Sequence, residues 1–178
     1  SAQKSLKQRE KEMALLAEAE KKQKKGASAP EERKKAEEDE KQLPEGLKEM
    51  MAQGGEYLRI LREANDAIPG EAISGKISRL ETVIRRIFET VERQPDQMEE
   101  MERFMDYYLP TTVKLVTAYR DFDRIEIEGD NIVSAKHEIE ETLDTINLAF
   151  ERLLDDLYQD AAIDITTDAS VLQTMLKK

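Results

Sequence analysis

Large apolar residues recur every three or four positions along most of the chain after Leu43, which is the spacing of one face of an α-helix. The first such stretch runs from Leu43 to Pro69-Gly70. The second is an unbroken heptad series that predicts a coiled-coil-like seam: Ile73, Ile77, Leu80, Ile84, Ile87 and Val91. Gly54 and Gly55 fall on the apolar face of the first stretch, where each costs about 1 kcal/mol relative to Ala. They therefore indicate either a close helix crossing or a hinge.

A third apolar stripe contains a proline. Pro95 can open this helix in its first turn, where a missing N–H costs nothing. The stripe comprises Met98, Met101, Met105, Tyr108, Thr112, Leu115, Tyr119 and Phe122. Because Pro110 removes a backbone hydrogen bond inside this pattern, we predict a kink there, with the Thr111 and Thr112 hydroxyls bonding to freed backbone groups. Leu109, which precedes the proline, is biased away from helical conformation.

The last long stripe follows a turn at residues 125–131. Its apolar positions are Ile132, Ile139, Leu143, Ile146, Phe150, Leu153 and Leu157. Beyond it, Ile163–Asp168 is typical of an extended connector, and Thr167 or Asp168 would then cap a short helix, Ala169–Leu176. Four helices of similar period joined by short turns predict an all-α fold, an elongated antiparallel helical bundle with a kinked central helix.

Residues 1–43 differ in character and are predicted to form a charged leader ahead of the bundle domain, residues 44–178. The leader's large apolar residues before its end are Leu6, Met13, Leu15 and Leu16. Such a segment buries too little apolar surface to offset its ordering entropy, so the break at residues 26–30 predicts a flexible joint between polar helices. The lysines within residues 21–25 fit an arm that binds acidic groups, but a solvated leader is the preferred interpretation.

Charge and composition exclude several classes of function. Residues 1–43 carry 12 Lys+Arg against 10 Asp+Glu, whereas residues 44–178 carry 16 against 29, a net charge of −13. An acidic bundle repels the phosphates of nucleic acids and anionic lipid headgroups. The absence of Cys excludes disulfides and thiolate metal sites and favours a cytoplasmic location.

No apolar run in the sequence reaches the roughly 20 residues that span a bilayer. The chain opens on Ser rather than Met, so we expect its natural N-terminus, and any anchor there, to lie further upstream.

The pair Asp121 and Asp123 is the first candidate for catalysis. An Asp-x-Asp pair can supply a nucleophile and a general acid for phosphoryl transfer. That chemistry normally follows a strand, whereas the residues before this pair continue a helical stripe, and Ile125 stands where a Thr or Val is expected. Two carboxylates at the end of a helix are therefore the preferred interpretation.

Other acidic and basic residues give weaker signals for a site. Asp156, Asp160, Asp164 and Asp168 would line one face and could bind a divalent cation if the helix continued, but a break near residue 162 is expected instead. His137, the single histidine, lies near the start of the last stripe and is interpreted as structural. We expect no metal site and no cofactor.

The aromatic residues around Pro110 suggest a binding surface. Tyr107 and Tyr108 are interpreted as packing at the core and rim of the bundle, although tyrosines flanking a kink also suit a recognition groove. The candidate binding residues are Tyr107, Tyr108, Pro110, Thr111, Thr112 and Tyr119.

Three stretches of the sequence resemble the XpaC-like family, the 5-bromo-4-chloroindolyl phosphate hydrolysis proteins. They are residues 104–119 (FMDYYLPTTVKLVTAY), 138–155 (EIEETLDTINLAFERLLD) and 164–176 (DITTDASVLQTML). The resemblance covers about residues 73–178, and the leader contributes nothing to it. It implies a bacterial cytoplasmic protein linked to dephosphorylation of an indolyl phosphate dye, often encoded beside TelA-like proteins of toxic-anion (tellurite) resistance. It supplies no catalytic residues to carry over.

Two functional hypotheses remain, together with one on assembly. The preferred one is a non-enzymatic interaction or regulatory protein, with a TelA-like partner bound at the Tyr107–Tyr119 region or at the acidic face. The alternative is a phosphatase that uses Asp121 and Asp123 with a divalent cation. Apolar seam residues that the bundle itself leaves uncovered would also permit a homo-oligomer.

Overall fold

The computed structural model describes residues 7–18, 30–31, 33–34 and 44–177, which form two units divided after Pro44. In the first unit, residues 7–18 are helical. The predicted joint at residues 26–30 lies outside the described residues except for Pro30, and the lysines of residues 21–25 lie outside them entirely. The division into a leader and a bundle domain stays a prediction, and the second unit carries the rest of the fold.

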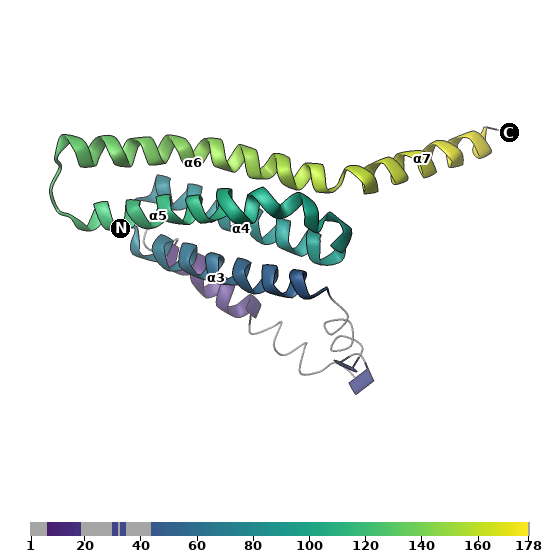
Figure 1. Ribbon diagram of the computed structural model, residues 1–178, viewed down its shortest axis with the longest axis horizontal. Coiled ribbons are helices and arrows are strands. Elements are labelled where there is room, and N and C mark those ends of the chain that lie inside the picture. Colours follow the sequence, from purple (N-terminus) through teal and green to yellow (C-terminus); the bar gives the residue numbers. More distant parts are fainter. Residues whose placement is uncertain (1–6, 19–29, 32, 35–43, 178) are drawn as a thin grey trace. The chain divides into compact units, whose positions relative to one another are not determined.

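The second unit is built from helices, and the described residues contain no strand, so the all-α prediction is confirmed. In chain order the elements are α3 (Glu45–Ala67), α4 (Glu71–Arg93), the 3-10 helix η1 (Pro95–Met101), the π-helix η2 (Phe104–Tyr108), α5 (Leu109–Arg124), α6 (Asp130–Leu157) and α7 (Gln159–Leu176). Helices α4 and α5 lie between α3 on one side and α6 on the other (Figure 1). Among the described helices, none is both long enough and apolar enough to cross a bilayer.

The heptad seam of α4 forms the centre of the core. All six of its predicted residues are buried, because α4 contacts both α3 and α6. Beside this seam lie three phenylalanine rings. The Phe104 ring centroid is 6.0 Å from that of Phe88 and 5.0 Å from that of Phe150, and both pairs meet edge to face. Residues from α4, η2 and α6 therefore meet at one aromatic cluster, which we call the phenylalanine cluster.

The crossing of α3 and α4 accounts for one of the two adjacent glycines. A Cβ atom added at Gly54 would lie only 2.6 Å from Cε2 and 2.7 Å from Cε1 of Phe88, whereas one added at Gly55 would meet nothing within 4 Å. Helix α3 continues without interruption through both positions. Of the two interpretations given by the sequence, the close helix crossing is therefore correct for Gly54, whereas Gly55 is exposed and its predicted place on the apolar face is wrong.

A largely buried polar network joins the end of α3 to the first half of α4. The Ser74 hydroxyl donates to Asn65 Oδ1 at 2.6 Å, and Asn65 Nδ2 lies 3.0 Å from both Ser78 Oγ and Glu81 Oε2. Burial raises the pKa of the Glu81 carboxyl, against the hydrogen bond from Asn65 and the charges of nearby arginines, which lower it. Glu81 is thus more easily protonated in the folded protein than in the unfolded chain.

This shift predicts a pH effect for Glu81→Gln. Because the pKa is higher in the folded state, the stability that comes from protonating Glu81 is complete below its ordinary pKa of 4.5 and is lost as the pH rises through the raised value. Gln keeps the shape and the acceptor for Asn65 but does not titrate. The variant should therefore gain stability relative to the wild type between pH 4 and pH 7 in urea unfolding. A difference that stays constant or falls would contradict the prediction.

The predicted interruption of the third helix takes the form of a π-helical turn just before Pro110. The Leu109 amide donates to the carbonyl of Phe104, five residues earlier, and Pro110 lies in the first turn of α5. A π-helical turn contains one residue more than an α-helical turn. The side chains after it are therefore rotated about the helix axis relative to the positions that a regular three-four spacing predicts. Consequently Leu109 is fully buried and Tyr108 is exposed, so the position of Tyr108 in the predicted stripe is wrong.

Two other predictions at this turn have different outcomes. Leu109 has helical dihedral angles (φ −69°, ψ −48°), so the predicted bias away from helix is wrong, because the π-turn accommodates the proline ring without leaving the helical region. The Thr112 hydroxyl does donate to the Tyr108 carbonyl, at 2.7 Å. For the Thr111 hydroxyl, no corresponding hydrogen bond is found among the described residues.

The C-terminal segment differs most from prediction. Residues predicted as an extended connector and a short capped helix form one continuous helix, α7, so neither Thr167 nor Asp168 is an N-cap. The Thr166 and Thr167 hydroxyls donate to the carbonyls of Ala162 and Ile163, one turn earlier. These side chains bond within the helix rather than competing with it, and the few tenths of a kcal/mol that β-branching costs per residue do not break it.

Candidate functional site

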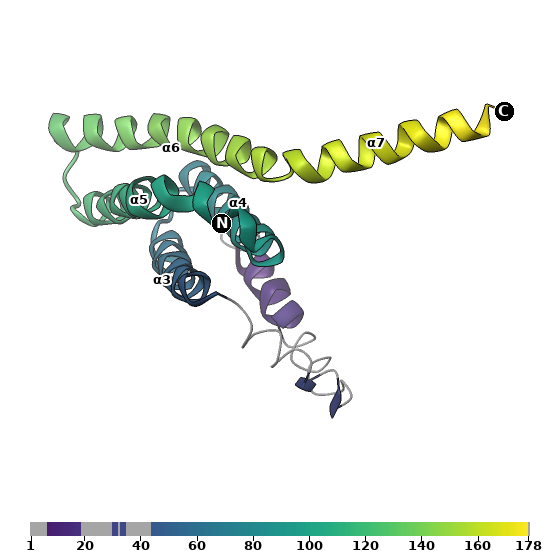
Figure 2. The same cartoon turned by 45° about the vertical axis from the view of Figure 1, so that its right-hand side comes forward.

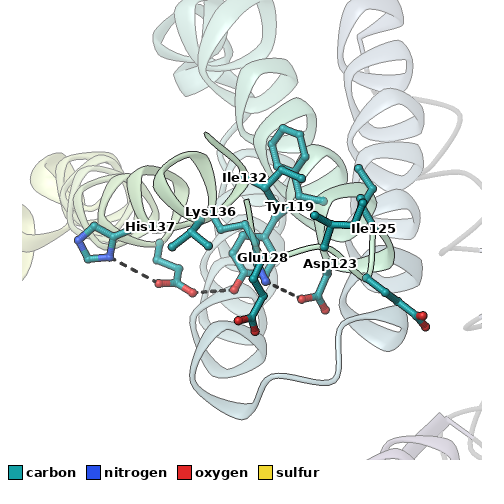
Figure 3. Close-up of a pocket in the computed structure, with 12 residues that line it drawn as sticks. Tyr119, Asp123, Ile125, Glu128, Ile132, Lys136 and His137 are labelled. Carbon is teal, nitrogen blue, oxygen red and sulfur yellow. Dashed lines mark hydrogen bonds and ion pairs between the residues drawn. The ribbon is translucent and has the colours of Figure 1, made fainter. Parts of the chain in front are cut away.

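A cavity of about 420 Å³ lies where the end of α5 turns back into the start of α6 (Figure 3). We call it the hairpin pocket. It is lined by Tyr119, Phe122, Asp123, Ile125, Glu126, Ile127, Glu128, Ile132, Val133, Lys136, His137 and Glu140. Helical spacing explains this set, because residues three and four positions apart share a face on each helix, while residues 125–128 of the connecting loop close one side.

Two hydrogen-bonded pairs cross the pocket from α5 to α6. The Tyr119 hydroxyl donates to Glu140 Oε1 at 2.6 Å, and Lys136 Nζ donates to Asp123 Oδ1 at 2.8 Å. Lys136 Nζ also lies 5.1 Å from the centroid of the Tyr119 ring, within the range of a cation–π contact. On the outer side, His137 Nδ1 is 3.9 Å from Glu140 Oε2 (Figure 3). The contacts of Tyr119 with Glu140 and of Lys136 with Asp123 and Tyr119 join α5 to α6, whereas the contact of His137 with Glu140 lies within α6.

Tyr119 has the clearest electrostatic perturbation in the pocket. Burial is the main cause that raises the pKa of its phenol, followed by the hydrogen bond to Glu140 and then by the negative charges of Glu140 and Asp123. The phenol therefore stays protonated and acts as a donor to Glu140 at neutral pH. A proton held in this way does not suit a general acid at neutral pH.

Removing this hydroxyl should weaken the fold by a measurable amount. We expect Tyr119→Phe to lower the free energy of unfolding at pH 7 by about 1 kcal/mol, because Glu140 loses a donor but remains partly solvated. In the wild type, the contribution of Tyr119 is complete below the ordinary tyrosine pKa of 10.0 and declines as the pH rises through the raised folded value. The variant should therefore lose less stability than the wild type above pH 10. An equally steep alkaline decline in both proteins would contradict the assignment.

The charge of the hairpin pocket is negative. Its carboxylates are Asp123, Glu126, Glu128 and Glu140, and its basic groups are Lys136 and the imidazole of His137. Because Lys136 is already paired with Asp123, its charge is largely compensated before any ligand arrives. The pocket therefore suits a cationic or amphipathic group better than a phosphate monoester, which carries up to two negative charges.

The structure separates the two aspartates of the catalytic candidate. Both lie within α5, and the side chains of residues two apart on a helix point about 160° away from each other. Asp123 faces the hairpin pocket, with a side chain 20% exposed, whereas the Asp121 side chain is 60% exposed and paired with Arg120 at 3.2 Å. The two carboxylates therefore do not converge on one point.

The candidate binding residues lie in three different environments. Tyr107 and Tyr108 are both exposed, with ring centroids 5.6 Å apart and meeting edge to face, beside the half-buried Pro110 and Thr111. Thr112 is buried, and Tyr119 belongs to the hairpin pocket instead. The interpretation of Tyr108 as core packing is wrong, while an exposed tyrosine pair remains available as a contact surface.

Sequence reasoning missed Lys136 and Glu140. The signal that could have found them is the symmetry of the hairpin, because Tyr119 with Glu140 and Asp123 with Lys136 are each placed evenly about residues 129–130. A short loop between two antiparallel helices brings such positions side by side.

Within the part of the chain that the structure describes, no group of three or more His, Asp or Glu side chains has the geometry to hold a metal ion.

A family model described as "5-bromo-4-chloroindolyl phosphate hydrolysis protein" matches residues 11–172 of the 178. The match begins inside the leader, so the estimate that the resemblance starts near residue 73 and excludes the leader is wrong. No curated protein and no solved structure matches the chain.

Proposed function

Because the chain belongs to the family of 5-bromo-4-chloroindolyl phosphate hydrolysis proteins, we propose that it contributes to that hydrolysis as a non-catalytic interaction protein. It would act in the cytoplasm by binding or regulating another protein, and a TelA-like protein of tellurite resistance is the proposed partner. A family described by hydrolysis of a dye contains the enzyme's regulators as readily as the enzyme itself, so the residues must decide between the two roles.

The observation that carries the proposal is the charge arrangement in the hairpin pocket. Hydrolysis of a phosphate monoester needs groups that attract and neutralise the phosphate oxygens. Here Lys136 is compensated by Asp123, and the remaining carboxylates would repel the substrate. The pocket's isoleucines and its acidic rim suit the side chains of a protein partner better, since interfaces combine an apolar centre with polar edges.

Two further features support binding rather than catalysis. The tyrosine pair Tyr107 and Tyr108 is exposed, and tyrosine is among the residues that contribute most to interfaces. Asp121 and Asp123, the residues of the phosphatase alternative, point about 160° away from each other on α5 and cannot act on one phosphorus atom without rearrangement.

The proposal is tested by assaying hydrolysis of the indolyl phosphate dye with the purified protein in the presence of magnesium, manganese or chelator. Asp121→Asn and Asp123→Asn are assayed in parallel, and circular dichroism checks that each variant remains folded. The proposal predicts the same background rate in every sample. Metal-dependent turnover that either substitution abolishes in a folded protein would support the phosphatase alternative and overturn the proposal.

A further inference from the structure

Helix α7 has no buried residue, although it is rich in large apolar side chains. Ile165 is 69% exposed, Leu172 56% and Leu176 76%. Figures 1 and 2 show α7 continuing past the end of the bundle, with no other helix of the second unit beside it. Contiguous apolar surface of this kind is uncommon on a soluble protein and marks a place where another molecule docks.

The apolar residues of α7 include one continuous face. At about 100° per residue, an arc of about 80° contains the α7 face, which we define as Ala161, Ile165, Ala169, Leu172 and Leu176. Asp164 and Asp168 border this face along one side. The helix is about 27 Å long at 1.5 Å per residue, which is enough for five turns of a partner helix.

Charge along this part of the chain has one sign. Between Arg152 and Lys177 there is no Lys or Arg, but there are five aspartates: Asp155, Asp156, Asp160, Asp164 and Asp168. A cavity of about 570 Å³ at the junction of α6 and α7 is lined in part by Asp155 and Asp156, together with Ala162, which adjoins the α7 face. A cationic side chain entering beside the apolar face would therefore meet carboxylates at both the junction and the border.

We propose that α7 is the docking surface for a basic amphipathic helix of another protein. This inference rests on the proposed function, because it specifies the chemistry of the partner. The partner helix would place leucine-like side chains on the α7 face and lysines or arginines against Asp164, Asp168 and the junction aspartates. Charge complementarity of this kind increases the rate of association and selects the partner.

The aspartates argue against a second copy of the chain as the occupant. An antiparallel pair that sets Ile165 opposite Leu172 of the second copy would bring the two Asp168 side chains together near the symmetry axis. A parallel pair would align every aspartate with its own counterpart. Both arrangements place like charges side by side, which costs free energy. The same carboxylates repel an anionic membrane surface.

The test uses the full chain and a fluorescent peptide of 18 residues built from leucine and lysine, with leucine at three-four spacing. A scrambled peptide of the same composition and a version with glutamate for lysine serve as controls, and binding is measured by fluorescence anisotropy. We expect the amphipathic basic peptide to bind at least about tenfold more tightly than either control.

Variants then locate the site. We expect peptide binding to weaken at least about tenfold in two variants, Leu172→Asp and the double variant Asp164→Lys with Asp168→Lys. All three side chains are exposed, so the substitutions should leave the fold intact. Leu148→Asp is the matched control, because Leu148 is an exposed leucine (61%) of α6 and should change binding less than twofold. Equal binding by all variants, or equal binding of the scrambled peptide, would overturn the proposal.

Sedimentation and hydrolysis measurements on the same preparations separate the remaining outcomes. A wild-type dimer that Leu172→Asp converts to monomer, with no selective peptide binding, would show that a second copy covers α7 and would overturn the proposal. No dye turnover together with no selective peptide binding would overturn the α7 site but leave the proposed interaction role in place. Metal-dependent turnover that Asp121→Asn or Asp123→Asn abolishes would overturn both.

Discussion

Replacing Phe104 with Ala is expected to lower the free energy of unfolding by about 4 kcal/mol. Phe104 is 2% exposed and is the member of the phenylalanine cluster that contacts both Phe88 of α4 and Phe150 of α6. Truncation removes two edge-to-face contacts and leaves a cavity whose walls come from three separate elements, which cannot easily close together.

Urea unfolding at pH 7 measures this effect as a shift of the midpoint with an unchanged slope. Phe104→Leu, which keeps most of the volume, should cost clearly less than the alanine variant. Leu148→Ala is the surface control and should change the free energy of unfolding by less than about 0.5 kcal/mol. A loss at Phe104 no larger than that of the control would show that the phenylalanine cluster does not contribute to the core packing.

Substituting Gly54 with Leu is expected to cost about 3 kcal/mol, although leucine favours helix far more than glycine does. The new side chain would meet the Phe88 ring, which is itself 4% exposed and held against Phe104. Because the ring has no free space to move into, α3 and α4 must separate, and the seam of α4 loses contacts on both sides of the crossing.

Gly55→Ala is the matched control for this substitution, because it changes the neighbouring residue of the same helix. With nothing within 4 Å of the added Cβ, it should raise the free energy of unfolding by about 1 kcal/mol through helix propensity alone. A loss of stability on substitution of Gly54 together with a gain on substitution of Gly55 would be a specific signature of the close crossing. Stabilisation by both substitutions would contradict the packing of α3 against α4.

The parts of the fold that follow from local periodicity were predictable. The apolar residues of the α4 seam alternate regularly between spacings of four and three, and all six are branched aliphatic residues, so the spacing alone places them in the core. Similarly, the loop at residues 125–129 contains glycine and carboxylates between two long stripes, which identifies a turn. In both cases one local signal determines the outcome.

The π-turn could not be predicted from the sequence, because two registers of the apolar stripe fit the sequence equally well. Tyr108 and Leu109 are adjacent, and either one continues an apolar stripe through Pro110. The choice depends on packing, because a π-turn buries Leu109 and exposes Tyr108, whereas a regular helix would do the reverse. The prediction for α7 was wrong because it assumed that the threonines end the helix, whereas their hydroxyls donate hydrogen bonds to carbonyls of the same helix.

The hairpin pocket was predictable only in part. The sequence points to Tyr119 and Asp123, but for separate reasons and in separate roles. Their partners Glu140 and Lys136 lie 21 and 13 residues further along the chain. Such pairings become visible only when the two helices are folded back on each other about the loop. Assigning a site therefore required the register of the hairpin, which apolar spacing alone does not give.

The measurement that tests the central claim most directly is the specific activity toward the indolyl phosphate dye across a gel-filtration peak of highly purified protein, with magnesium or manganese present. An interaction protein predicts that activity per mole of protein varies across the peak and falls toward the uncatalysed rate with each further purification step. A constant specific activity that follows the protein, and that Asp123→Asn removes without unfolding it, would contradict the account and place catalysis in the hairpin pocket.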